Sequence, residues 1–225
     1  SEFVSNVSHE LKTPMTSMKV LADSLVGQQG VPEDLYQEFM RDITAEIDRE
    51  NRIITDLLTL VKMDKKNADL QIQHMSINQL LEDILKRLRP IADKRNIDLI
   101  LDSFRPVEAD VDELKFTSAI SNLVENAIKY NVDDGWVRVS LDADHKFFYV
   151  TVADSGMGIP EDSLSRIFER FYRVDKSHSR EIGGTGLGLA ITRSTIGMHH
   201  GVIKVFSKEG EGTTFSVRVP LSYIP

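Results

Sequence analysis

The pattern of hydrophobic positions divides the chain into two parts. Up to about residue 64, apolar residues recur at spacings of three, four or seven, the period of amphipathic helices. Two helical stretches carry such stripes, the first with Phe3, Val7, Leu11, Met18, Leu21 and Leu25 and the second with Leu35, Phe39, Ile43, Ile47, Ile54, Leu57 and Val61. The segment 27–32 between them holds two glycines and a proline, residues that end and begin helices. The pattern therefore predicts a helical hairpin.

A lone pair of amphipathic helices cannot enclose its own apolar face. Two copies of the hairpin can do so by packing into a four-helix bundle, and we favour this homodimer. The alternative is that the stripe packs on the rest of the same chain.

From residue 67 onward, short β-like runs alternate with helical stretches. Strands are expected at 70–75, 97–102, 137–141, 147–152, 202–206 and 213–219, and helices at 77–95, 111–130, 161–168 and 187–200. Because several strands are consecutive, the pattern predicts an α+β fold in which this second part is a layered α/β sandwich. We place the boundary in the polar segment 62–67, which gives domains 1–66 and 67–225.

Composition and charge exclude several classes of protein. Of the 225 residues, 41% are hydrophobic and 28% charged, as in a soluble globular protein. The absence of cysteine excludes disulfides, thiolate zinc sites and cysteine nucleophiles. A net charge of −8 argues against binding to a nucleic-acid backbone or to an anionic membrane surface. No apolar run approaches the ~20 residues that span a bilayer, and no signal peptide is visible. Since the chain starts without Met, we interpret it as a fragment of a longer protein or as a processed chain.

The first glycine cluster is the segment from Asp154 to Ile159, which follows an expected strand and has Gly156 and Gly158 at its centre. Glycines allow a backbone to approach a ligand closely, and a carboxylate at a strand end can accept a hydrogen bond from an exocyclic amine. A tight loop without a ligand is an equally good interpretation of this motif alone.

The second cluster, Gly183-Gly-Thr-Gly-Leu-Gly-Leu189, leads into an expected helix. The free N–H groups and the positive dipole end of a helix attract phosphates. The cluster comes too late in the chain for a dinucleotide-binding unit, and the GxxxxGK[ST] pattern of a P-loop is absent. The sequence therefore predicts a nucleotide phosphate site of a third kind.

The third element is an expected helix on which Asn122, Asn126 and Lys129 share one face. Amide oxygens can ligate Mg²⁺, and a lysine one turn further on can contact phosphate. Any one of these residues alone would be read as a solvated side chain, but their combination with two glycine clusters favours a site.

The fourth element is the segment from Val7 to Pro14 in the first helix, where Glu10 directly follows His9. A neutral imidazole is a good nucleophile toward phosphorus, and a neighbouring carboxylate can orient it and take its proton. A zinc site of the HExxH type is excluded, because Thr13 stands where the second histidine would be.

Taken together, these motifs and their order resemble the sensor histidine kinases of bacterial two-component systems. The resemblance also includes the segments Phe168-Glu-Arg-Phe-Tyr-Arg173 and Gly210-Glu-Gly-Thr-Thr-Phe215 and covers essentially the whole chain. It implies a dimerisation and histidine-phosphotransfer hairpin followed by an ATP-binding domain of the Bergerat (GHKL) type. It further implies a membrane-receptor fragment that lies in the cytoplasm, with the parent protein anchored in the bacterial inner membrane.

The resemblance also implies an activity, cofactors and partners. The chain would use ATP and Mg²⁺ to phosphorylate His9 and pass the phosphoryl group to an aspartate of a response regulator receiver domain. Glu10 would be the adjacent acid or base, and Thr13 would position water for dephosphorylation of that partner. Mg²⁺ would be held by Asn126 with support from Asn122. The implied nucleotide-binding residues are Asn122, Asn126, Lys129, Tyr130, Asp154, Gly156, Gly158, Ile159, Phe168, Phe171, Arg173, Gly184, Thr185, Gly186, Leu187, Gly188 and Thr214.

Three rival functions remain at this point: an ATP hydrolase of the same nucleotide fold, a noncatalytic dimeric scaffold, and a core whose dominant activity is that of a phosphatase. Related hydrolases carry a glutamate one turn before the Mg²⁺-binding asparagine, where this chain has Asn122. An amide cannot take a proton from water, which favours the kinase. The segment 174–182 is expected to be a charged lid, and we interpret His178 as a solvated lid residue rather than a second phosphoacceptor.

Overall fold

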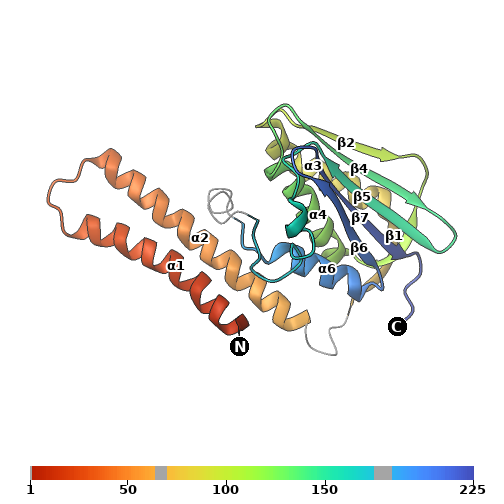
Figure 1. Ribbon diagram of the computed structural model, residues 1–225, viewed down its shortest axis with the longest axis horizontal. Coiled ribbons are helices and arrows are strands. Elements are labelled where there is room, and N and C mark those ends of the chain that lie inside the picture. The colour runs from red at the N-terminus through yellow and green to blue at the C-terminus, as the bar shows by residue number, and fades with distance from the viewer. Residues whose placement is uncertain (1, 64–69, 175–183) are drawn as a thin grey trace.

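The computed structural model describes residues 2–63, 70–174 and 184–225 and contains a helical hairpin beside an α/β unit (Figure 1). Helix α1 spans Glu2–Val26 and helix α2 spans Glu33–Met63, so the hairpin that the sequence predicts is present. Gly30 adopts a positive φ of 75° in the connection, a conformation that carries little cost for glycine. Pro14 lies inside α1 and is buried.

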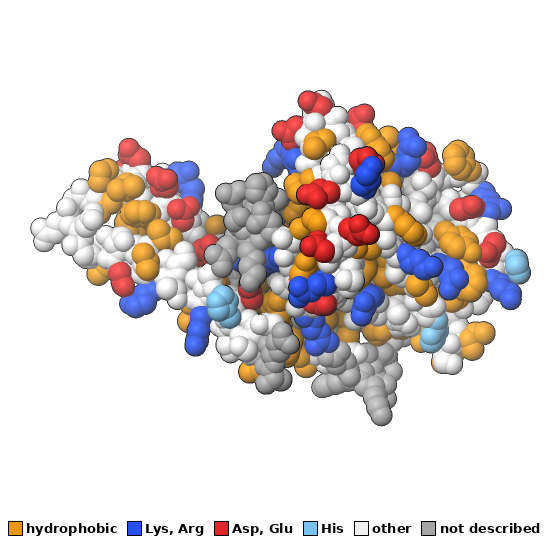
Figure 2. All heavy atoms as spheres, viewed as in Figure 1, with side chains coloured by type: hydrophobic (Ala, Val, Ile, Leu, Met, Phe, Trp, Pro, Cys, Tyr) orange, Lys and Arg blue, Asp and Glu red, His pale blue; other side chains and the backbone are white. Residues whose placement is uncertain are grey.

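Only part of the apolar stripe of the hairpin is covered within one chain. Ile53 and Leu60 of α2 are buried. Many large apolar side chains of the hairpin are exposed: Val4, Met15, Val20, Val26, Leu35, Tyr36, Met40, Ile47, Ile54, Leu58 and Val61. Orange side chains accordingly gather on the visible face of the hairpin (Figure 2). Four of the stripe residues, Leu35, Ile47, Ile54 and Val61 of α2, are among the exposed ones, so the α/β unit of the same chain leaves this part of the stripe uncovered.

The described residues of the α/β unit form two sheets and three longer helices. The elements are β1 (Ile72–Ser76), α3 (Ile77–Asp93), β2 (Asp98–Ser103), β3 (Glu108–Asp112), α4 (Glu113–Lys129), β4 (Trp136–Ala143), β5 (Phe147–Asp154), the 3₁₀ turn η1 (Glu161–Ser163), α6 (Gly188–Met198), β6 (Val202–Lys208) and β7 (Gly212–Pro220). The larger sheet has the order β2-β4-β5-β7-β6, with β2 parallel to β4 and every other pair antiparallel. Strands β1 and β3 form a separate antiparallel pair. The predicted α/β sandwich is confirmed.

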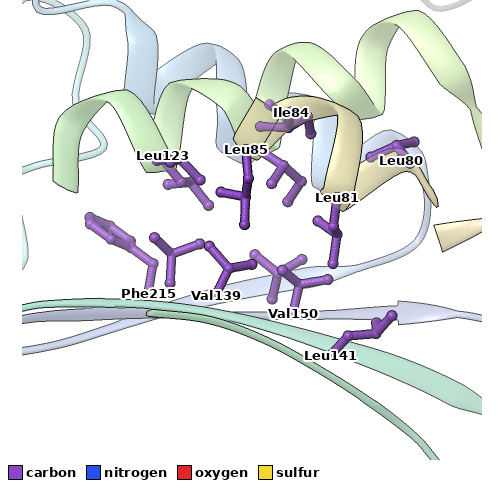
Figure 3. Packing of buried hydrophobic residues seen from close by; sticks show 14 of the residues in the cluster. Leu80, Leu81, Ile84, Leu85, Leu123, Val139, Leu141, Val150 and Phe215 are labelled. Carbon is purple, nitrogen blue, oxygen red and sulfur yellow. The ribbon is translucent and has the colours of Figure 1, made fainter. Parts of the chain in front are cut away.

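Helices cover one face of the larger sheet and enclose the core between the two layers (Figure 3). Leu81 and Leu85 of α3 point toward the sheet, where Val139 and Val150 point back (Figure 3). Along β5, buried and less buried side chains alternate with the period of two that a half-covered strand requires. This packing holds α4 and α6 side by side over the sheet, which fixes the walls of the site described below.

Strand β3 is the element that the sequence reading missed. We expected a helix from residue 111, but Val111 belongs to β3, and helix α4 begins only at Glu113. Asp112 caps that helix by accepting a hydrogen bond from the backbone N–H of Lys115 at 3.0 Å. Residue 111 pairs with Gln73 in the β1–β3 ladder, a contact between distant parts of the chain that local periodicity cannot reveal.

A second difference concerns the expected helix at 161–168, which is a single 3₁₀ turn followed by further turns. Ile167 is buried in the core and the hydroxyl of Tyr172 donates a hydrogen bond to Ser163 Oγ at 2.9 Å, so tertiary packing fixes this irregular segment. The expected domain boundary between residues 66 and 67 lies outside the described residues.

Candidate functional site

A cavity of about 390 Å³ lies between α4, α6 and the two glycine segments, and α2 closes part of its wall. Most of the nucleotide-binding residues named from the sequence line it: Asn122, Asn126, Lys129, Tyr130, Asp154, Gly158, Ile159, Arg173, Gly184, Thr185, Gly186 and Gly188. Others that were named do not belong to the lining: Gly156, Phe168, Phe171, Leu187 and Thr214. The fold thus gathers side chains from distant parts of the sequence, and two of them, Asn122 and Thr192, are joined by a hydrogen bond across 70 positions.

Asp154 supplies a carboxylate at one end of this cavity. It is the last residue of β5, and its Oδ1 accepts a hydrogen bond from the backbone N–H of Gly156 at 2.8 Å. Burial raises its pKa to about 6, although the N–H groups of Gly156 and Thr213 favour the charged form. A buried acceptor in a cavity lined largely by apolar groups suits the exocyclic amine of a nucleobase.

Thr213 lines the cavity, whereas Thr214, which was expected there from the sequence, does not. Successive residues of a strand point to opposite faces, and Thr213 shares its face with Phe215, which also lines the cavity. The sequence already indicates which face of the strand is buried, because apolar residues alternate along it at Phe215, Val217 and Val219, and these three side chains are buried in the core. Thr213 continues the same alternation.

The two glycines of the first cluster have different roles. A Cβ at Gly156 would overlap the carbonyl oxygen of Tyr130, so this glycine allows the loop to pack on the end of α4. Gly158 has a φ of +70°, and a Cβ there would overlap the carbonyl of Lys208. Only Gly158 lines the cavity, and the role of Gly156 is to hold Asp154 and Tyr130 together.

Helix α4 contributes a row of polar side chains to the cavity wall. Asn122 Nδ2 donates a hydrogen bond to Thr192 Oγ1 of α6 at 3.0 Å, which orients its amide. Lys129 Nζ lies 3.9 Å from Glu125 Oε2, and both residues line the cavity together with Asn126. Glu125 is a lining residue that the sequence reading did not assign, although it lies one position before Asn126.

The donor set fits a magnesium ion shared with phosphate. The amide oxygens of Asn122 and Asn126 and the carboxylate of Glu125 are hard oxygen ligands. Among residues 2–63, 70–174 and 184–225, no group of three His, Asp or Glu residues could hold a metal ion by itself. A Mg²⁺ ion at this wall would therefore depend on phosphate oxygens for the rest of its coordination.

The second glycine cluster forms the opposite wall. Thr185 Oγ1 accepts a hydrogen bond from the backbone N–H of Leu187 at 3.2 Å, and helix α6 begins at Gly188 without a side-chain cap on its first turn. A Cβ at Gly188 would come within 2.7 Å of Asn122 Oδ1, so only glycine allows α6 to begin this close to α4. The uncapped N–H groups at this helix end provide an anion site beside the asparagines.

Residues named from the sequence that do not line the cavity support its wall. Phe168 packs against Phe215 with ring centroids 6.3 Å apart, and Leu187 is fully buried. Phe171 donates its backbone N–H to the carbonyl of Gly186 at 2.8 Å. Of the expected lid, Val174 alone belongs to the described residues, and His178 lies outside them.

The cavity is connected directly to the first helix of the hairpin. Arg173, which lines the cavity, places Nη2 3.3 Å from Glu10 Oε2, and the arginine side chain is only 6% exposed. Phe171 and Phe3 lie 6.2 Å apart between ring centroids, and the guanidinium of Arg170 lies 5.2 Å from the Phe3 ring. Glu10 therefore contacts the cavity wall, although it belongs to a different motif of the sequence.

His9 is exposed on α1, next to the half-buried Glu10. The hydroxyl of Thr13 donates a hydrogen bond to the carbonyl oxygen of His9 at 3.0 Å, one turn away. An exposed imidazole beside a carboxylate that contacts the cavity wall is accessible to an electrophile delivered from that cavity.

The second helix of the hairpin also reaches the cavity, which the sequence reading did not foresee. Arg52 and Asp56 of α2 both line it, and Thr185 Oγ1 donates a hydrogen bond to Asp56 Oδ2 at 2.7 Å. No periodic pattern could have identified them, because both are polar residues on a helix whose apolar stripe dominates the signal.

Comparison with known families gives two matches. The His Kinase A (phospho-acceptor) domain family matches residues 1–66. The family described as histidine kinase-, DNA gyrase B-, and HSP90-like ATPase matches residues 111–223. Together these matches cover both the hairpin and most of the α/β unit.

Proteins with sequences similar to this chain include sensor histidine kinases. The chain is 35% identical over 222 residues to the sensor histidine kinase WalK of Bacillus subtilis, covering 97% of this chain and 36% of WalK. It is 36% identical over 219 residues to the sensor-like histidine kinase SenX3 of Mycolicibacterium smegmatis, covering 97% and 57%. This chain therefore spans about a third to three fifths of the length of these relatives.

Two solved structures share the fold over nearly the whole chain. Histidine kinase ThkA in complex with response regulator protein TrrA superposes with a TM-score of 0.81 at 24% identity, covering 98% of this chain and 61% of that one. Acinetobacter baumannii histidine kinase AdeS superposes with a TM-score of 0.75 at 21% identity, covering 95% and 98%. Within the described ranges, no helix combines the length and apolar character needed to cross a membrane.

Proposed function

The chain belongs to the two-component sensor histidine kinases, and we propose that it is the catalytic core of one of them. Residues 1–66 would serve as the dimerisation and phosphotransfer domain and residues 67–225 as the ATP-binding domain. The core would phosphorylate itself on His9 and transfer the phosphoryl group to an aspartate of a response regulator.

The cavity residues divide into a base end and a phosphate end. Asp154 would accept the hydrogen bond of the adenine amine, and Thr213 supports it through its backbone N–H. At the other end, Asn126 and Asn122 would hold Mg²⁺, which supplies charge neutralisation for phosphoryl transfer when bound. Lys129 and the N–H groups at the start of α6 would attract the phosphates.

The observation that carries the proposal is the contact between Arg173 and Glu10. It joins a residue of the nucleotide cavity to the carboxylate next to the phosphoacceptor. Glu10 would orient the imidazole of His9 and accept its proton during attack on the terminal phosphorus of ATP. The attacked phosphoryl group would come from the same chain or from its dimer partner.

The chemistry of the cavity favours a kinase over a hydrolase. Asn122 hydrogen-bonds to Thr192 through its amide, which has no capacity to take a proton from water. Glu125 is the nearest carboxylate in this row, and it lies 3.9 Å from the ammonium of Lys129.

The decisive experiment is incubation of the chain with γ-labelled ATP and Mg²⁺. We expect a protein-bound label that is lost in acid and retained in base, because a phosphorus–nitrogen bond has this stability. The variant His9→Gln should remain unlabelled. If the label is acid-stable, or if His9→Gln is labelled like the wild type, the kinase proposal is wrong. Continued phosphate release by His9→Gln at the wild-type rate would instead indicate a hydrolase.

We also propose a phosphatase activity toward the regulator that uses Thr13. Its hydroxyl lies one turn after His9 and is held by the His9 carbonyl at 3.0 Å, with lone pairs left to orient water. Thr13→Ala should abolish stimulation of regulator dephosphorylation while leaving His9 labelling intact. Thr16→Ala is the matched control, because Thr16 makes the same kind of bond to the Lys12 carbonyl at 2.8 Å. Equal loss in both variants would contradict the assignment.

The exposed apolar face of the hairpin supports a homodimer with a four-helix bundle. A response regulator receiver domain is the proposed partner of α1 and the adjacent half of α2, in line with the complex of ThkA with TrrA. We propose that this core lies in the cytoplasm and belongs to a sensor anchored in the inner membrane, and that it binds neither nucleic acid nor lipid.

A further inference from the structure

Helix α2 carries an acidic side chain into the phosphate end of the nucleotide cavity. Asp56 lines the cavity together with the glycine segment, and its Oδ2 accepts the hydroxyl hydrogen of Thr185 at 2.7 Å. Thr185 in turn accepts the N–H of Leu187, so the carboxylate is attached to the loop that precedes helix α6. The contact joins residues 129 positions apart, one from each part of the chain.

The position of Asp56 is unfavourable for a carboxylate. Burial raises its pKa, and the hydrogen bond from Thr185 and the charge of Arg52 offset that effect only in part. The loop that Asp56 contacts leads into the start of α6, where the N–H groups are uncapped and attract anions, and Lys129 lines the same cavity. A carboxylate here occupies space beside the glycine loop and uses the hydroxyl donor of Thr185, both of which phosphates would need.

Two anions cannot share these donors without a large electrostatic cost. We propose that Asp56 is an autoinhibitory group of the nucleotide site, which competes with the terminal phosphates of a nucleoside triphosphate for Thr185 and the glycine loop. This inference rests on the proposed function of the cavity and adds a regulation of it.

Release of Asp56 also affects the contacts of the hairpin with Phe171 and Arg173. The backbone N–H of Phe171 bonds to the carbonyl of Gly186 at 2.8 Å, and the Phe171 ring contacts Phe3 of α1. Two residues further on, Arg173 pairs with Glu10. Displacement of the glycine loop by phosphates would therefore loosen the contacts with both helices and leave Glu10 available to His9. Triphosphate binding and the docked hairpin are thus coupled, and by linkage each weakens the other.

The first experiment measures nucleotide affinity of the full chain by calorimetry with Mg²⁺. Asp56→Asn keeps the shape and an acceptor for Thr185 but removes the charge. We expect ATP to bind about threefold to tenfold more tightly than to the wild type, ADP to gain less, and adenosine to gain nothing. Asp48→Asn is the matched control, because Asp48 is exposed on the same helix and does not line the cavity.

Each result of this experiment is informative. Unchanged ATP affinity in Asp56→Asn means that the carboxylate does not compete with phosphate, and weaker affinity means that it assists the metal or the nucleotide. Either result overturns the inference while leaving the kinase proposal intact. An absence of ATP binding in every form of the chain overturns both.

The second experiment measures docking itself. The sequence has no cysteine, so a pair of fluorescent labels can be placed at Gln28→Cys and Lys146→Cys, both at exposed positions. Labelled chain diluted into excess unlabelled chain reports the distance within one chain of a dimer. We expect ATP with Mg²⁺ to change energy transfer and Asp56→Asn to produce part of that change without nucleotide. Unchanged transfer on saturation with ATP overturns the coupling.

Discussion

The guanidinium Nη2 of Arg173 lies 3.3 Å from Oε2 of Glu10, although the two residues are 163 positions apart in the sequence. The ion pair is largely shielded from water, since the side chains of Arg173 and Glu10 are 6% and 22% exposed. Such a pair is screened less by salt than one on the surface. It connects the nucleotide cavity with the helix that carries His9.

Glu10→Gln tests the role of the carboxylate in proton transfer. The glutamine keeps the shape of the side chain but is a very poor proton acceptor, so His9 labelling should slow by about 10²–10⁴-fold. Calorimetry should give an ATP affinity equal to or higher than that of the wild type, since Glu10 does not line the cavity and its loss weakens a docking contact that opposes triphosphate binding. A labelling rate close to that of the wild type would show that His9 needs no base at this position.

Asp154→Asn should stabilise the nucleotide-free chain in a pH-dependent manner. Burial raises the folded-state pKa to about 6 from 3.8, so the folded state binds more protons than the unfolded state between these values. This group therefore lowers stability as pH rises from about 4 to 6, and the full cost is present above 6. We expect the variant to gain about 2 kcal/mol over the wild type at pH 7.5 and nothing at pH 4, measured by urea unfolding.

The same residue predicts how base recognition depends on pH. Adenosine, which has no phosphate to titrate, should bind about tenfold more weakly at pH 5 than at pH 7, because a proton then occupies most of the Asp154 carboxylates. Asp154→Asn should bind more weakly at pH 7 and lose this pH dependence. Adenosine affinity of the wild type that is independent of pH would contradict the assignment of Asp154 to the base.

Gly156→Ala and Gly197→Ala form a matched pair of glycine substitutions. The added Cβ at Gly156 would overlap the Tyr130 carbonyl and lie 2.8 Å from Asp154 Oδ1, so we expect a loss of about 1–3 kcal/mol and weaker ATP binding. Nothing lies within 4 Å of a Cβ at Gly197, inside α6, and alanine there should add about 0.5–1 kcal/mol. Thermal unfolding distinguishes the two, and equal effects would mean that the close approach at Gly156 is not limiting.

Phe148→Ala tests the core between the helices and the larger sheet. Phe148 is fully buried and packs edge to face on Phe116 at 5.7 Å, so truncation should cost about 3–5 kcal/mol. Phe104→Ala removes the same atoms from a side chain that is 91% exposed and should change stability by less than about 0.5 kcal/mol. Denaturant unfolding compares the two variants.

Leu58→Glu tests dimerisation through the hairpin. Leu58 is 56% exposed on the uncovered face of α2, and a buried carboxylate at a dimer interface would be strongly unfavourable. Sedimentation should show a monomer. Leu114→Glu, on the 80% exposed Leu114 of α4, should remain dimeric, and dissociation of both variants would place the interface elsewhere.

The local pattern of apolar residues predicted most helices and strands of this protein correctly, because helices and strands bury their apolar residues with different periods. The stripes of the hairpin and the alternation in β5 are examples, and the polar face of Asn122, Asn126 and Lys129 follows from the helical repeat. Strand β3 was missed because its five residues are stabilised by pairing with β1, not by a local pattern.

The sequence by itself therefore determined the residue types of the candidate site: a histidine beside a carboxylate, two amides and a lysine on one face, and two glycine clusters. The tertiary structure decided which of them meet. Because Thr213 and Thr214 point to opposite faces of their strand, only Thr213 lines the cavity. The position of the hairpin places Asp56 in contact with Thr185 and Glu10 in contact with Arg173. These contacts depend on how the surfaces of the hairpin and the α/β unit fit together, and such a fit is a property of side-chain packing over the whole chain, which spacing along the sequence does not encode.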